Sequence, residues 1–169
     1  INMSSYNRSL YLRYADALRH PGHFSTAISE FFAKDANINV VHPFNEIQSA
    51  DAFFLKFMAP LQQAFEGLYR RDYIFMTGQF EGKDWISSTG YYVGRFAKDW
   101  IGIKATDTLC YLRYGEFHQV KNGKVVESYI YLDIPELMIA CNEWPLKMGP
   151  GLSRGYTGLI QGPASCDGV

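Results

Sequence analysis

A carboxylate and an imidazole two residues apart are the first candidates for chemistry in this 169-residue chain. Glu116 and His118 lie in a segment rich in β-forming residues, and side chains alternate along a strand, so Tyr114, Glu116 and His118 share one face. If that face is enclosed, burial raises the pKa of a glutamate and lowers that of a histidine, which favours general acid–base catalysis near neutral pH. The alternative is a solvent-facing strand on which Glu116 pairs with Arg113 or Lys124.

The histidines offer one further candidate. His42 directly precedes Pro43, which holds the backbone extended and aims the ring, so His42 is either an acid–base residue or a strand-end histidine bonded to a backbone carbonyl. His20 and His23 flank a Pro–Gly turn and are expected in solvent. Because the four histidines do not converge at the spacing of metal ligands, we predict no metal site. We also predict no cofactor.

Aromatic residues make up 16% of the chain, a content typical of a lined pocket, a core or a subunit interface. Trp85 and Tyr91 share one strand face, and Tyr129 and Tyr131 share another. Trp100 lies in a loop, where an apolar residue indicates a lid or an interface. The predicted ligand-binding residues are Trp85, Tyr91, Trp100, Tyr114, His118 and Tyr129.

The elements that must position these residues are helices followed by strands. Hydrophobic periodicity and turn signals predict helices over 5–19, 24–33, 51–66 and 135–141, and strands over 36–41, 69–77, 85–96, 106–120 and 124–132. Pro60 predicts a kink or break in the third helix, and Asn122–Gly123 predicts a tight hairpin turn. Asp133 is placed to be the N-cap of the last helix. The charged stretch 70–72 is interpreted as a cluster at a turn edge without a function.

This order predicts an α+β fold in which one curved antiparallel sheet wraps around the N-terminal helices. Such a sheet forms a cone whose interior can hold a ligand, and its convex face needs a partner, so we expect a homodimer. The domain spans 1–141, and the Gly- and Pro-rich segment 142–169 is predicted to be a tail or linker.

Composition narrows the function classes. The net charge of −1 provides no field for nucleic acid or an anionic membrane, and no apolar run is long enough for a membrane helix. The three cysteines have long, irregular spacing, which indicates reduced thiols in a cytoplasmic protein.

Several motifs extend across about residues 8–141. They are Phe32–Ala36 before a strand, Gly90–Phe96, the loop Trp100–Thr106, and the hairpin Arg113–Glu127 followed by Asp133. Together they resemble the nuclear transport factor 2-like superfamily, and within it the SnoaL-like polyketide (ester) cyclases, which implies the cone-shaped fold. The chain departs from that family at the loop, where Lys104 and Asp107 replace a proline and a glycine. It also departs near Ile130, where cyclases carry an acid–base aspartate.

The resemblance also implies site residues. Ketosteroid isomerases of the same superfamily keep an acid at the position of Glu116 and a tyrosine on the first helix in an Arg–Tyr pair, which resembles Arg13–Tyr14. Their base precedes a proline, as His42 does here. The implied catalytic residues are Glu116 as acid–base group, His42 as its partner and Tyr14 as oxyanion donor.

Two functions follow from these observations. The first is a cofactor-free enzyme that cyclises or isomerises an apolar, polyketide-like carbonyl or ester by acid–base chemistry. The alternative is a non-catalytic module that binds a small molecule or a second copy of itself. The tail at 142–169 also suggests a second similar domain in a longer protein.

Overall fold

The structure is a computed structural model that describes residues 3–141, so the predicted tail at 142–169 lies outside the described residues. The helical elements are α1 (Met3–Ala17), η1 (Pro21–His23), α2 (Phe24–Phe31), α3 (Ala50–Phe53), η2 (Phe54–Met58), α4 (Ala59–Ala64) and α5 (Ile134–Ala140). The strands are β1 (Phe32–Val40), β2 (Asn45–Gln48), β3 (Phe65–Phe80), β4 (Lys83–Phe96), β5 (Leu109–Lys121) and β6 (Lys124–Leu132). The predicted order of helices and strands is confirmed, except that β2 was not predicted because it is four residues long with one buried position.

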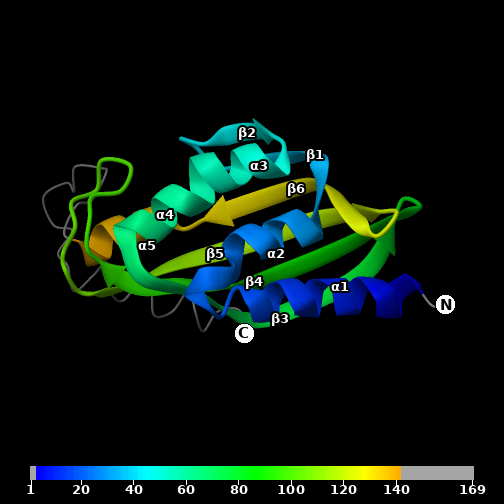
Figure 1. Cartoon of the computed structure of the whole chain (residues 1–169), viewed down its shortest axis with the longest axis horizontal. Coiled ribbons are helices and arrows are strands. Elements are labelled where there is room, and N and C mark those ends of the chain that lie inside the picture. Colours follow the sequence, from blue (N-terminus) through cyan, green and yellow to red (C-terminus); the bar gives the residue numbers. More distant parts are fainter. Residues whose placement is uncertain (1–2, 142–169) are drawn as a thin grey trace, which may run out of the picture.

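The six strands form one curved sheet in the order β2-β1-β6-β5-β4-β3 (Figure 1). β3 to β6 form an antiparallel meander, but β1 pairs with β6 in parallel. The expectation of an entirely antiparallel sheet is therefore wrong at this one pair. After β2 the chain passes through α3, η2 and α4 to the far edge of the sheet and meanders back, so β6 reaches β1 running in the same direction.

The helices α1, α2 and the α3–α4 segment lie across one face of the sheet and fill its concave side (Figure 1). Leu10, Tyr11 and Tyr14 of α1 pack there with Phe31 of α2, and all four are buried. The α+β cone predicted from the sequence is confirmed. None of the helices within residues 3–141 is long and apolar enough to cross a membrane.

Local signals in the sequence correspond to local features of the structure. Asn122 and Gly123 both have positive φ, 54° and 76°, as the tight hairpin turn requires. Asp133 caps α5 by accepting a hydrogen bond from the Glu136 amide at 3.0 Å. Pro60 lies in the first turn of α4, directly after the π-helical segment η2, which matches the predicted break.

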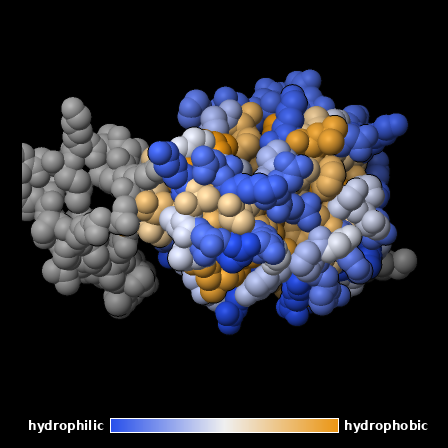
Figure 2. All heavy atoms as spheres, turned by 60° about the vertical axis from the view of Figure 1, so that its left-hand side comes forward, coloured by the Kyte–Doolittle hydropathy of each residue, from blue (hydrophilic) through white to orange (hydrophobic). Residues whose placement is uncertain are grey.

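Hydrophobic side chains are not confined to the interior. On the face shown in Figure 2 they reach the surface in separate patches between polar side chains. The outer face of the sheet also exposes large apolar side chains, since Met76, Phe80, Phe117 and Tyr131 are each at least half exposed.

Candidate functional site

The candidate site is built on the inner face of β5. Tyr114, Glu116 and His118 alternate with neighbours that are exposed or half-buried, and the exposed fraction of Glu116 is 1% and that of His118 is 0%. The prediction that these three side chains share a face is confirmed, and that face is the concave one. A carboxylate and an imidazole thus lie together inside the cone.

Arg70 of β3 holds the carboxylate. Its Nη1 lies 2.7 Å from Glu116 Oε1, and its Nε lies 2.9 Å from Asp72 Oδ1. The interpretation of 70–72 as a charged cluster at a turn edge is wrong, because Arg70 lies within a 16-residue strand and is 1% exposed. The structure also excludes the solvent-facing alternative, since Glu116 pairs with Arg70 and not with Arg113 or Lys124. Alternation along β3 could have placed Arg70 on the same face as Leu68.

His118 continues the network on the other side of Glu116. Its Nε2 lies 2.9 Å from Glu116 Oε2, and its Nδ1 lies 2.7 Å from Ser128 Oγ on β6. The rings of Phe31 and Phe32 stand edge-on to the imidazole, with centroids at 5.1 and 5.9 Å. The histidine is therefore held by polar groups at both nitrogens and is covered by two aromatic rings.

The charge on Glu116 is set by two opposing effects. Burial by itself would raise the pKa of the Glu116 carboxyl, but the nearby Arg70 guanidinium, and then His118, lower it below its ordinary value. Ser88 Oγ donates a longer hydrogen bond, 3.4 Å, to Glu116 Oε2. Glu116 is therefore ionised at neutral pH.

This lowered pKa predicts an acid-sensitive fold. Because the pKa of Glu116 is lower in the folded chain than the ordinary 4.5, its contribution to stability is present above that pH and is lost as the pH falls through the folded value. We expect the free energy of unfolding, measured with urea, to fall less steeply below pH 4.5 for Glu116→Gln than for the unaltered protein. Glu46→Gln, at an exposed position of β2, serves as the control and is expected to keep the original pH dependence. Equal slopes for Glu116→Gln and the unaltered protein would contradict the prediction.

Four tyrosines surround the charged cluster. The hydroxyls of Tyr11 and Tyr114 donate hydrogen bonds to Asp72, and Arg70 Nη2 donates to the Tyr11 hydroxyl at 3.0 Å.

The hydroxyls of Tyr14 and Tyr92 are buried and have no hydrogen-bond partner within residues 3–141. Burial, with the nearby Glu116, raises the pKa of Tyr14 well above its ordinary value. Tyr14 is thus a protonated hydroxyl without a hydrogen-bond partner in the described residues, and its ring lies beside Arg70 of the cluster.

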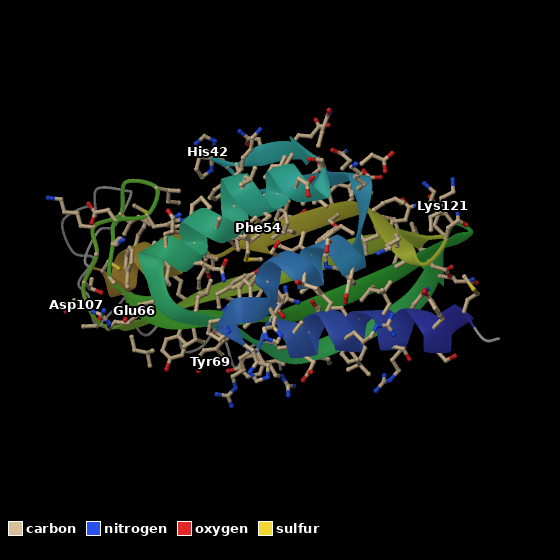
Figure 3. The ribbon with its side chains drawn as sticks, in the orientation of Figure 1. His42, Phe54, Glu66, Tyr69, Asp107 and Lys121 are labelled. Atoms are coloured by element: carbon tan, nitrogen blue, oxygen red, sulfur yellow. The ribbon has the colours of Figure 1, made fainter. Side chains whose placement is uncertain are left out.

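His42 is not part of this cluster. It lies on the turn between β1 and β2 and is exposed, at the edge of the molecule where Figure 3 labels it. The role of His42 as partner of the buried Glu116 is therefore corrected: the imidazole beside that carboxylate belongs to His118. β1 ends at Val40, two residues too early to carry residue 42 into the interior.

The predicted ligand-binding residues separate into three places. Tyr114 and His118 lie in the interior, while Trp85, Tyr91 and Tyr129 lie on the outer face of the sheet, where two shallow pockets of about 690 and 660 Å³ open. Trp100 is 3% exposed and packs against Phe44 and Phe65 at centroid distances of 5.9 and 6.1 Å. It lies against core aromatics and is not an open lid.

A third pocket, of about 410 Å³, lies on the helical side between α1, α2 and the β5–β6 turn. Tyr14 is among its lining residues. Within residues 3–141 there is no group of three or more histidine, cysteine, aspartate or glutamate side chains that could hold a metal ion.

The curved sheet around its helices defines this chain as an α+β cone of the nuclear transport factor 2-like fold. No protein-family model matches the chain, and no curated protein matches it in sequence. Solved structures do match it over most of its length. AclR from Streptomyces galilaeus, provisionally assigned as a hydroxylase, is 20% identical with a TM-score of 0.69, and the match covers 84% of this chain and 99% of AclR.

A provisionally assigned SnoaL-like polyketide cyclase from Jannaschia sp. CCS1 is 16% identical, with a TM-score of 0.69 and coverage of 86% and 97%. An NTF2-like protein of unknown function from Burkholderia pseudomallei K96243 is 12% identical, with a TM-score of 0.60 and coverage of 79% and 95%. The predicted resemblance to SnoaL-like and nuclear transport factor 2-like proteins is confirmed at the level of the fold.

Proposed function

We propose that this chain is an enzyme that performs acid–base chemistry on an apolar ligand with a carbonyl or ester group. The observation that carries the proposal is a buried, ionised Glu116 hydrogen-bonded to His118, close to the uncommitted hydroxyl of Tyr14. Provisional assignment of structural neighbours as polyketide cyclases or a hydroxylase supports an enzyme of this kind.

In the proposed reaction, Glu116 takes a proton from the carbon next to the carbonyl group. The electron pair of that C–H bond forms a C=C bond while the π pair of the carbonyl moves onto its oxygen, and the Tyr14 hydroxyl donates a hydrogen bond to the resulting enolate oxygen. During isomerisation, Glu116 returns the proton to a different carbon. During ring closure, the enolate carbon instead attacks a second carbonyl carbon, and Glu116 returns the proton to the alkoxide oxygen that this attack forms. Arg70 and His118 act as positioning residues, because they hold the carboxylate through its two oxygens.

The test begins with ligand discovery. We expect hits in a thermal-shift screen of fused-ring and linear apolar ketones, esters and lactones at neutral pH. Binding is detectable in this screen, because a ligand at about a hundred times its dissociation constant adds about 2.7 kcal/mol to the free energy of unfolding. For a hit that is turned over, Glu116→Gln is expected to lower kcat by about 10²–10⁴. Tyr14→Phe is expected to lower kcat by about 10²–10³ with a smaller effect on KM.

His42→Ala is the matched control and is expected to leave turnover unchanged, because His42 is exposed and outside the cluster. Unchanged turnover in Glu116→Gln would contradict the proposal. Glu116→Gln removes a charge and Tyr14→Phe removes a hydroxyl, and neither changes the size of the side chain greatly. Their melting temperatures separate a catalytic effect from unfolding.

The alternative is a non-catalytic module that pairs with a second copy of the chain. It is favoured by the apolar outer face of the sheet, where Met76 is 63%, Phe117 50% and Tyr131 56% exposed. Burial of an apolar side chain of this size is favourable by roughly 1.5–3 kcal/mol, so binding of a second copy to this face would stabilise the dimer. A dimer mass in solution together with no ligand in the screen would favour this alternative.

A further inference from the structure

The pocket on the helical side has an inner wall made of two aromatic rings. Tyr14 and Phe31 are 2% and 1% exposed, and their rings stack with centroids 4.0 Å apart and an interplanar angle of 7°. The exposed residues Tyr6, Arg13 and Glu30 line the same pocket further out. The pocket therefore runs from the surface to the stacked pair Tyr14–Phe31, which we call the two-ring wall.

The two-ring wall also contacts the buried charged groups. The Phe31 ring meets the His118 ring edge-on at 5.1 Å, and Arg70 Cζ lies 5.1 Å from the centroid of the Tyr14 ring. Arg70 and His118 are the two groups that hold Glu116. The pocket and the Arg70–Glu116–His118 cluster are thus adjacent, separated by one layer of side chains.

The chemistry of the pocket suggests its ligand. Leu10, Ala27 and the two-ring wall provide an apolar floor suited to a flat ring. Of the cations at the rim, Lys124 is committed to the carbonyls of Ser29 and Glu30, at 3.3 and 2.6 Å. Arg13 forms no hydrogen bond or ion pair with any other residue of the described part of the chain, so its guanidinium is available to an anion.

We propose that this pocket binds a flat, apolar ligand carrying a carboxylate, which Arg13 pairs at the rim, and that displacement of the two-ring wall brings the ligand to His118 and Glu116. Binding in the pocket stands independently of the enzymatic proposal, while delivery to Glu116 rests on that proposed function. The path from the pocket to the imidazole is short, because Phe31 both lines the pocket and contacts the His118 ring.

The experiment is a titration of ¹⁵N-labelled protein with naphthalene-1-carboxylate, followed by NMR. We expect amide shifts at Arg13, Ala27, Phe31 and Gly123, and a shift of the His118 ring nitrogens. Arg13→Gln is expected to weaken binding of the carboxylate by about three- to fivefold, as an exposed ion pair does, and to leave binding of the neutral ketone 1-acetonaphthone unchanged. Arg113→Gln is the control, because Arg113 lines a pocket on the opposite face of the sheet.

Each outcome has a definite meaning. Shifts confined to Ser87, Phe117 and Tyr131 would place the probe on the outer face and overturn the proposal. Equal effects of Arg13→Gln and Arg113→Gln would overturn the role of Arg13, and unchanged His118 nitrogens at saturation would overturn delivery through the two-ring wall. If the probe binds as expected but Glu116→Gln keeps full turnover of a substrate, the enzymatic proposal fails and the pocket stands. Arg13 is exposed, so its substitution is compatible with folding, which circular dichroism verifies.

Discussion

Arg70→Met is expected to lower the free energy of unfolding by about 3–5 kcal/mol. Arg70 is 1% exposed, and its guanidinium is bonded to Glu116, Asp72 and Tyr11. Methionine keeps a similar length but removes the positive charge, so the buried carboxylate of Glu116 loses its compensating ion. Equilibrium unfolding in urea at pH 7 measures the change.

Arg71→Met is the matched control, because the adjacent Arg71 is exposed and its replacement is expected to change stability by no more than about 0.5 kcal/mol. The double variant Arg70→Met, Glu116→Leu is expected to recover part of the loss, since it removes the uncompensated carboxylate as well. A loss in Arg70→Met no larger than in Arg71→Met would show that the buried ion pair is not needed for folding.

Gly90→Ala is expected to lower the free energy of unfolding by about 1–3 kcal/mol. A Cβ at residue 90 would overlap the Arg71 carbonyl oxygen and would lie 2.8 Å from both Asp72 Cα and the Tyr114 hydroxyl. The first two of these atoms are backbone, so β3 itself would have to move away from β4. The same movement would disturb Asp72, which accepts hydrogen bonds from Arg70 and Tyr114.

Gly115→Ala is the control for this prediction. Gly115 pairs with Thr89, directly beside Gly90, but a Cβ there would have no atom within 4 Å. We expect Gly115→Ala to stay within about 0.5 kcal/mol of the unaltered protein in the same urea experiment. Equal stabilities of the two alanine variants would mean that β3 adjusts to the added methyl group at little cost.

Both predictions concern β3, where interpretation of the sequence was weakest. The charged stretch 70–72 looks like a surface segment because arginine is seldom buried without a partner. Its partner, Glu116, lies 46 residues further along the chain. Nothing near Arg70 in the sequence identifies that carboxylate, so only the pairing of β3, β4 and β5 revealed the buried ion pair.

His42 and His118 give a second example of a contact that local sequence patterns cannot identify. The resemblance to ketosteroid isomerases implies a role for His42, because His42 precedes a proline. The side chain that reaches Glu116 is instead His118, which alternation along β5 had already placed on the same face. Periodicity within one strand is a local property and was reliable here, while the position of a turn relative to a distant strand is not local.

The sequence by itself determined what depends on neighbours in the chain. Alternation placed Tyr114, Glu116 and His118 together, Asn122–Gly123 set the hairpin, and Asp133 capped the final helix, because backbone geometry and short hydrogen bonds act over a few residues.

Only the tertiary structure decided which face of the sheet is enclosed, that β1 runs parallel to β6, and that Arg70 supplies the charge beside Glu116. These outcomes depend on contacts between segments far apart in the chain. Which face is buried and which charge is compensated depends on how all of these segments pack together.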